Sequence, residues 1–330
     1  MFYMKIFELN TMLKGLAMGI AEIIPGVSGG TIAFITGIYE RLMKMITSFN
    51  LSFFLLIRKG RWQTAFASID LPFIVSLGSG MLTGIVIGIF AISHLLIHYP
   101  EPLWGFFFGL IIASVLFIAK QYNVLKLSSL MTIILGFLIA YSISVLSPVE
   151  GNDSYWFIFI SGIIAISAML LPGISGSFML VLMGMYSFIL GSVKLILTDF
   201  DLTAIGIISV FVVGLVVGAA TFSRIFSWLF LRYKDITLAL LTGFLMGSLF
   251  KIWPWRNITK VFVKETNQFL DVTDASMLSS LEAETFKVIS ETPVWPALYL
   301  GEAKVIMTII VFVIGFLLVF SFDFFKKGKT

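Results

Sequence analysis

The residues best suited to bind a ligand occur in one phrase that appears twice. The copies are Ile24-Pro25-Gly26-Val27-Ser28-Gly29-Gly30 and, 147 positions later, Leu171-Pro172-Gly173-Ile174-Ser175-Gly176-Ser177. A Pro-Gly break inside a membrane segment releases backbone amides, which is tolerated only where protein or a water-filled cavity receives them. Two such breaks in corresponding halves of a chain point to the binding site of a transporter.

The turns that follow the Pro-Gly pairs are predicted to bind an anion. Ser28 and Ser175 are suited to N-cap the next helix, and the glycines let a ligand approach the backbone closely. The first amides of a helix are unpaired and its N-terminus is partly positive, so two converging N-termini attract a phosphate or a chloride. The alternative is that Pro-Gly only kinks two helices, but the repeated Ser-Gly favours the anion site. The predicted substrate-binding residues are Pro25, Gly26, Ser28, Gly29, Gly30, Thr31, Gly173, Ser175, Gly176, Ser177 and Arg224.

Few ionisable residues lie inside the apolar segments. Glu22 precedes Pro25 by three residues, and the equivalent residue of the second copy is Met169. Glu22 is either a proton-coupling group or a partner for the turn amides, and we favour coupling because intramembrane acids are functional by default. Arg224 aligns with His94 in the repeat, and it either binds a phosphate or extends to the membrane surface.

Composition indicates a membrane protein with one integral domain, residues 1–330. The chain is 59% hydrophobic and 12% charged, and its mean hydropathy is +1.04, far from soluble globular norms. The absence of cysteine excludes disulfides and thiol chemistry. The net charge of +4 reflects Lys and Arg at segment ends rather than a nucleic-acid surface, and no cofactor or metal is expected.

The positive-inside rule gives a self-consistent topology with both termini in the cytoplasm. The predicted crossing helices are 71–97, 103–119, 128–147, from about 203, 236–252 and 304–323. The broken segments begin with arms 12–24 and 157–171, about 20 Å and 22 Å long at ~1.5 Å per residue, too short for a hydrocarbon core of about 30 Å. Each broken segment is therefore predicted to be a re-entrant hairpin. The external loop 253–303 is a small cap or a solvated loop, and the solvated loop is slightly favoured.

The two halves are predicted to be inverted repeats, about 11–147 and about 156–323. After each Pro-Gly turn, small residues recur in the same order: Gly84 and Gly88 align with Gly214 and Gly218, and Gly109 and Ala113 align with Gly243 and Gly247. Three crossings before the second hairpin invert its orientation. Glycines spaced four residues apart also form ordinary packing faces between helices. That alternative would explain each aligned pair, but not why the pairs follow in the same order in both halves. The predicted fold is an all-α polytopic membrane protein with two re-entrant hairpins.

The motifs around the first turn resemble those of the bacterial polyprenyl-phosphate transporter family. The resemblance rests on Lys14-Gly15-Leu16-Ala17-Met18-Gly19, Glu22, the first Pro-Gly phrase through Thr31 and its continuation to Leu42, together with the second phrase. It covers roughly residues 11–252 and the final helix. It implies a flippase that returns undecaprenyl phosphate from the outer to the inner leaflet of the cytoplasmic membrane, for reuse in cell-envelope polymer synthesis.

Two other functions are compatible with parts of the sequence. A channel or proton-coupled antiporter for a small inorganic anion would use the same turns. A lipid phosphatase is disfavoured, because the chain has two histidines, no cysteine and no acidic cluster at a membrane face. The expected partners are a polyprenyl-phosphate lipid, membrane lipid, a proton or another coupling ion and a second copy of the chain, but not nucleic acid.

Overall fold

The computed structural model describes residues 7–24, 27–146, 148–149, 151–263, 268–272, 277 and 286–327. Two of the predicted site residues, Pro25 and Gly26, lie outside these ranges. The helices of the first half are α1 (Leu9–Glu22), α2 (Gly29–Ile35), α3 (Tyr39–Ser48), α4 (Leu51–Arg58), α5 (Trp62–Ala67), α6 (Leu71–His98), α7 (Pro100–Ala119) and α8 (Leu127–Val145).

The described residues of the second half form further helices and a group of strands. They are α9 (Tyr155–Leu170), α10 (Gly176–Leu182), α11 (Tyr186–Asp199), α12 (Leu202–Arg232), α13 (Lys234–Ser248), β1 (Arg256–Val263), β2 (Gln268–Asp271), β3 (Phe286–Pro293), a short 3-10 helix (Pro296–Leu298) and α15 (Val305–Lys327). Every helix predicted from the sequence is present, with ends that differ by a few residues.

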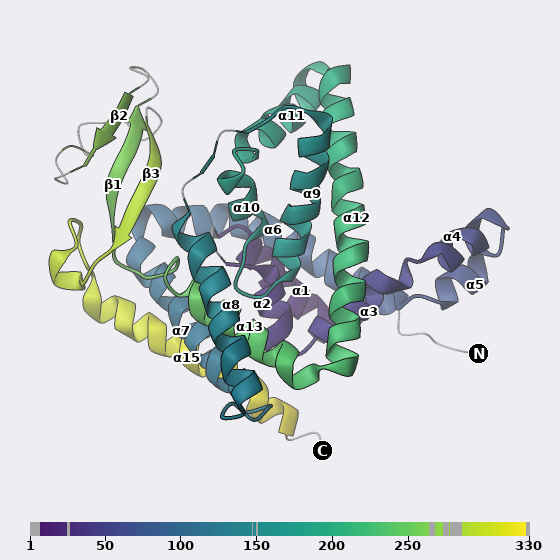
Figure 1. Cartoon of the computed structure of the whole chain (residues 1–330), viewed down its shortest axis with the longest axis horizontal. Coiled ribbons are helices and arrows are strands. Elements are labelled where there is room, and N and C mark those ends of the chain that lie inside the picture. The colour runs from purple at the N-terminus through teal and green to yellow at the C-terminus, as the bar shows by residue number, and fades with distance from the viewer. Residues whose placement is uncertain are drawn as a thin grey trace.

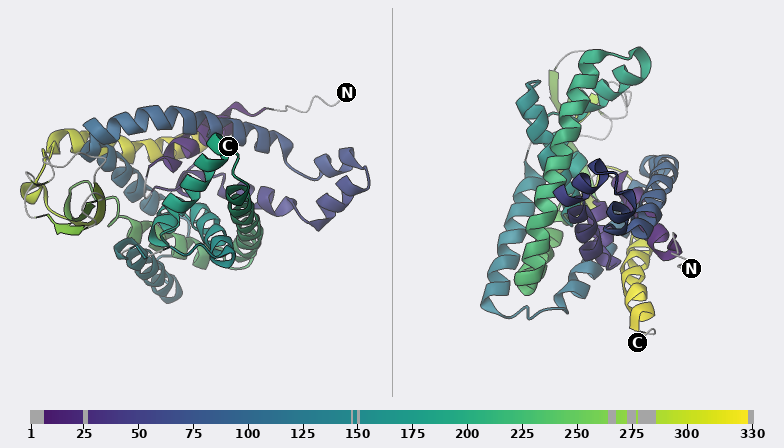
Figure 2. Two further views of the ribbon diagram at one scale, coloured as in Figure 1. Left: turned by 90° about the horizontal axis from the view of Figure 1, so that it is seen from above. Right: turned by 90° about the vertical axis from the view of Figure 1, so that its right-hand side faces the viewer.

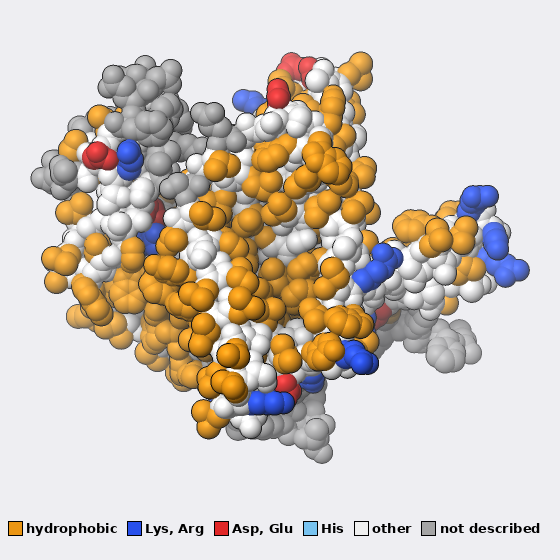
Figure 3. Space-filling view, viewed as in Figure 1, with side chains coloured by type: hydrophobic (Ala, Val, Ile, Leu, Met, Phe, Trp, Pro, Cys, Tyr) orange, Lys and Arg blue, Asp and Glu red, His pale blue; other side chains and the backbone are white. Residues whose placement is uncertain are grey.

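The helical part has the character of a multi-pass membrane protein. Four described helices, α6, α7, α8 and α12, are long and apolar enough to cross a membrane, and α10 with α11 makes a fifth if their 106° bend is taken as one broken span. Hydrophobic side chains cover most of the face shown in Figure 3. Acidic side chains gather there at the turn between α11 and α12, and many Lys and Arg side chains lie at the opposite end and on α4 and α5.

Small residues set the packing of the long helices, which lie in four close pairs. Helix α1 packs along α6, α9 along α12, α7 along α15 and α8 along α13 (Figure 1). A Cβ on Gly84 would lie 2.1 Å from the carbonyl oxygen of Leu16, and one on Gly109 would lie 2.2 Å from that of Phe312. Only glycine permits backbones to approach this closely.

The glycine contacts reveal the register of the repeat and correct one sequence alignment. Tyr99 is the C-cap of α6 and Tyr233 is the C-cap of α12. The two residues have nearly the same backbone angles (φ −140°, ψ 49° and φ −137°, ψ 50°). They lie 134 positions apart. At that offset Gly80 matches Gly214, and both meet equivalent carbonyls of α1 and α9.

The predicted matching of Gly84 with Gly214 is therefore wrong by one helical turn, and Arg224 corresponds to Phe90 instead of His94. The error has a simple cause. Gly80, Gly84 and Gly88 recur every four residues, so a shift of one turn preserves the pattern.

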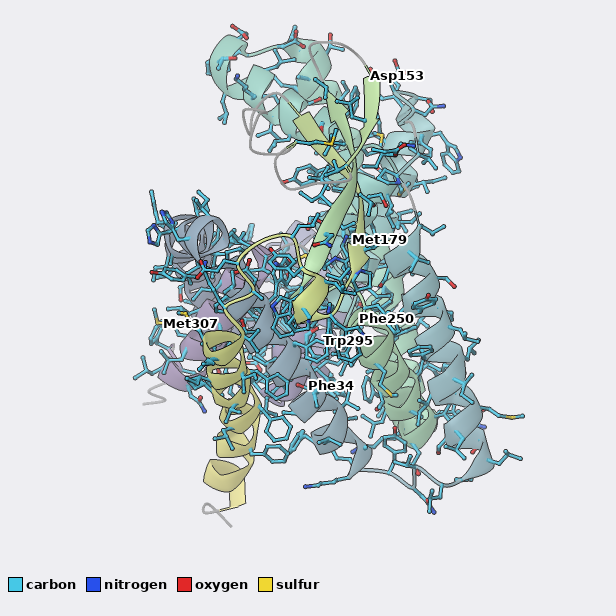
Figure 4. The ribbon with its side chains drawn as sticks, turned by 90° about the vertical axis from the view of Figure 1, so that its left-hand side faces the viewer. Phe34, Asp153, Met179, Phe250, Trp295 and Met307 are labelled. Atoms are coloured by element: carbon cyan, nitrogen blue, oxygen red, sulfur yellow. The ribbon has the colours of Figure 1, made fainter. Side chains whose placement is uncertain are left out.

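The described part of the segment 253–303 forms a small sheet, so the favoured prediction of a simple solvated loop is wrong. The strands form a three-stranded antiparallel sheet in the order β2-β1-β3, which departs from an all-α fold. The sheet buries Val261 and Val263 of β1 against Val272. At its base, the Trp255 Nε1–H donates to the carbonyl oxygen of Ala303 at 2.7 Å. Trp295, labelled in Figure 4, lies near this base with its ring centroid 5.9 Å from that of Trp253.

Helices α4 and α5 form an insertion that the second half lacks. Residues 49–70, which include both helices, separate α3 from α6, whereas only Phe200 and Asp201 separate α11 from α12. The insertion projects away from the bundle (Figures 1 and 2). Its exposed apolar side chains are Leu51, Phe54, Leu55, Trp62 and Phe66, and its exposed basic residues are Arg58, Lys59 and Arg61.

Candidate functional site

The two Pro-Gly turns contact each other directly. The Ser28 hydroxyl donates to the carbonyl oxygen of Met169 at 2.7 Å, and the Gly173 amide donates to Thr31 Oγ1 at 2.9 Å. Ser28 and Thr31 are fully buried. A Cβ on Gly30 would lie 2.8 Å from the carbonyl oxygens of Met169 and Leu170, so glycine is required at this approach. Residues separated by more than 140 positions thus meet at one point inside the bundle.

At the first turn, side chains of the protein accept hydrogen bonds from the first backbone amides of α2. The Ser28 hydroxyl caps the helix by accepting from the Gly30 amide at 3.0 Å, and the Glu22 carboxylate accepts from the Gly29 amide at 2.7 Å. Glu22 is therefore a partner for the turn amides, as one of the two sequence interpretations states. Its carboxylate occupies the place where an anion would bind the start of α2.

The second turn has the same backbone plan but carries no acid. Ser175 caps α10 by accepting from the Phe178 amide at 3.4 Å, and its hydroxyl lies 2.9 Å from that of Ser177. Gly173 has φ +87°, a conformation that favours glycine. Among the described residues, the amides of Gly176 and Ser177 have no hydrogen-bond acceptor.

A small cavity lies beside the second turn. Its empty space is about 250 Å³ when open solvent is included, but the room for a water-sized molecule is only about 10 Å³. Its lining residues are Ala140, Ile143, Ser144, Gly173, Ile174, Ser175, Phe178 and Lys251. The Lys251 Nζ lies 4.8 Å from the centroid of the Phe178 ring. Sequence reasoning missed Lys251, because a lysine in the last turn of a predicted crossing helix is ordinarily assigned to the membrane surface.

Arg224 does not take part in the contact between the turns. It is exposed on α12 and forms no hydrogen bond or ion pair with a described residue. Of the predicted site residues, the structure brings together Ser28, Gly29, Gly30, Thr31 and Gly173, with Ser175, Gly176 and Ser177 directly following in the second turn.

An ion-pair cluster joins the starts of three helices in the first half. The Arg41 guanidinium of α3 contacts the Glu8 carboxylate before α1 and the Asp70 carboxylate before α6, each at 2.7 Å. Hydrogen bonds from Arg41 lower the pKa of Glu8 to about 2. The equivalent residues of the second half are Tyr155, Phe188 and Ala204, so this cluster has no counterpart there.

A metal site is not evident among the residues that the structure describes. The described residues contain no group of three or more His, Cys, Asp or Glu side chains that could hold a metal ion.

Comparisons with known proteins agree on one family. A family model described as undecaprenyl phosphate translocase-like matches residues 18–270. The chain is 44% identical over 277 residues to a polyprenyl-phosphate transporter of Vibrio cholerae, covering 84% of this chain and 87% of the relative. It is 31% identical over 263 residues to a polyprenyl-phosphate transporter of Staphylococcus aureus, covering 76% and 88%. No solved structure matches. The chain therefore belongs to the undecaprenyl phosphate translocase-like family.

Proposed function

We propose that this protein is a flippase that returns undecaprenyl phosphate from the outer to the inner leaflet of the bacterial cytoplasmic membrane. Both relatives are named polyprenyl-phosphate transporters, and the described helices include four that are long and apolar enough to span a bilayer. The long prenyl tail stays in the lipid while the phosphate crosses through the bundle, so the path must be open to the side.

The observation that carries the proposal is the difference between the two turns. At the first turn, a Glu22 carboxyl oxygen accepts from the Gly29 amide at 2.7 Å, which supports the idea that the equivalent amide of the second turn can bind an acceptor oxygen. At the second turn, Met169 replaces the acid and the matching Gly176 amide is without an acceptor among the described residues. A phosphate oxygen from the substrate supplies the missing acceptor.

Inverted repeats and re-entrant hairpins are the second part of the proposal. The pairs α1 with α6 and α9 with α12 are equivalent by sequence offset, and so are α7 with α15 and α13 with α8. Gly136 meets the carbonyl oxygen of Leu240 just as Gly315 meets that of Phe106. Such matched contacts support a pseudo-two-fold axis, about which the hairpins open in alternation with both termini in the cytoplasm.

Proteoliposomes test this function directly. Polyprenyl phosphate is placed in both leaflets, and an impermeant phosphatase outside removes the accessible phosphate. Active transporter exposes the inner pool, so hydrolysis continues past the outer-leaflet fraction. Hydrolysis that stops at that fraction with folded protein present contradicts the flippase. Chloride or phosphate flux in vesicles free of polyprenyl lipid would favour the inorganic-anion channel or antiporter instead.

Coupling to protons through Glu22 stays a prediction. In the same vesicles, an imposed pH gradient is expected to change the rate of hydrolysis for the wild type and not for Glu22→Gln. Equal responses of the two proteins would exclude Glu22 as the coupling group. An unresponsive wild type would exclude proton coupling itself.

A further inference from the structure

We propose that the cavity beside the second turn is the binding site for the phosphate head group, with Lys251 as its cation. This inference rests on the proposed function and assigns a residue to it. The ligand class is a phosphate monoester that carries a long apolar tail.

Lys251 has no carboxylate within ion-pair distance among the described residues. It is partly buried at the end of α13 and forms no hydrogen bond or ion pair with the described residues. The nearby Glu291 carboxylate is already paired with Arg256 at 3.1 Å. A partly buried ammonium without a counter-ion is unfavourable, and a bound phosphate would offset that free energy.

The cavity also offers polar groups that suit a phosphate. Ser144, Ser175 and Gly173 are among its lining residues. Both hydroxyls can reorient toward a new acceptor, because the present partner of Ser144 is the Ala140 carbonyl and that of Ser175 is another serine. These donors and the ammonium lie around a single space next to the second turn.

The position of the cavity favours a lipid over free phosphate. It lies between α8, α10 and the end of α13. Helix α8 exposes a run of large apolar side chains just before the cavity, namely Leu135, Leu138 and Ile139. A prenyl tail can follow this exposed face of α8 within the lipid while the head group occupies the cavity.

The two halves differ in charge in a complementary way. The first turn carries its own acceptor, the Glu22 carboxyl group, and the residue equivalent to Lys251 there is Phe117. The second turn carries the cation Lys251, and the residue equivalent to Glu22 is Met169. An external anion is therefore needed only at the second turn, which is the side where the cavity lies.

Binding measurements on the full chain in lipid nanodiscs test this site. The probes are a prenyl monophosphate, the corresponding prenyl alcohol and inorganic phosphate. We expect Lys251→Met to weaken monophosphate binding about tenfold or more, because it removes a charge-assisted contact, and to leave alcohol binding unchanged. Lys251→Arg keeps the charge and retains most of the affinity. Lys194→Met, which removes an exposed lysine of α11, serves as the matched control and leaves binding unchanged.

The outcomes separate this inference from the proposed function. Unchanged monophosphate binding by Lys251→Met overturns the site while the flippase proposal stands. A wild type that binds the alcohol as tightly as the monophosphate contradicts the function itself. Competition by inorganic phosphate at the same concentration as the prenyl monophosphate would identify the ligand as free phosphate and overturn the lipid assignment.

Discussion

Replacing Ser28 by alanine is expected to separate the two turns. The Ser28 hydroxyl caps α2 through the Gly30 amide and also donates to the Met169 carbonyl, which lies at the end of α9 without another donor among the described residues. Loss of an N-cap costs about 1 kcal/mol. Leaving a buried carbonyl unpaired costs a further 1–3 kcal/mol, roughly. The free energy of unfolding should therefore fall by about 2–4 kcal/mol.

The matched control is Ser175→Ala. Ser175 caps α10 but has no hydrogen bond to the first turn, so we expect its loss to cost only about 0.5–2 kcal/mol. Both variants can be unfolded by dodecyl sulfate in mixed micelles, with helix content followed by circular dichroism. If Ser28→Ala is no more destabilising than Ser175→Ala, the contact between the turns contributes nothing to stability and the reasoning is refuted.

Three further predictions follow from other parts of the fold. Because Arg41 lowers the pKa of Glu8 from 4.5 to about 2, the stabilisation from this pair is present above pH 4.5 and is lost as the pH falls toward 2. Acid titration of unfolding should accordingly show a steeper loss in this window for the wild type than for Arg41→Gln, and parallel curves would contradict it. Gly84→Ala places a Cβ 2.1 Å from a backbone oxygen and should destabilise by about 1–3 kcal/mol, whereas Gly78→Ala on the same helix meets open space and should be neutral or stabilising; equal effects on dodecyl sulfate unfolding would exclude close packing at Gly84. A spin label on Phe54→Cys, in a chain that has no native cysteine, should be accessible to oxygen and shielded from a water-soluble nickel chelate in nanodiscs, because the exposed apolar side chains of α4 and α5 suit the membrane interface. High accessibility to the chelate would instead place this helix in water.

The helices were predictable because the length of each apolar run, and the residues that begin and end it, determine them locally. Asp201 is an example of a residue that begins a helix. Its side chain accepts a hydrogen bond from the Ala204 amide at 2.7 Å and caps α12, which the sequence analysis predicts from about residue 203. The contact between the turns was also predictable in outline, because the same Pro-Gly phrase recurs in both halves. These features depend on a few adjacent residues or on a repeated motif.

The remaining features depend on contacts between distant segments. The sheet was missed because the alternation around Val261 and Val263 is short and is surrounded by charged residues. Lys251 was missed because its significance depends on Phe178 and on the second turn, both more than 70 positions away. The helix register was misjudged by one turn because glycines at a spacing of four fit two alignments equally well.

The two halves of the chain differ in charge, and this difference bears on the proposed transport cycle. Arg41 ties the starts of α1, α3 and α6 together, whereas the equivalent positions of the second half are uncharged. The side chains of this cluster are between 31% and 39% exposed, so each pair contributes only about 0–1 kcal/mol. An energy of that size is enough to bias an equilibrium between two hairpin positions without locking either of them. In the proposed cycle, the ion-pair cluster favours one position of the first hairpin, and the second hairpin lies beside Lys251 and the cavity where we propose that the head group binds.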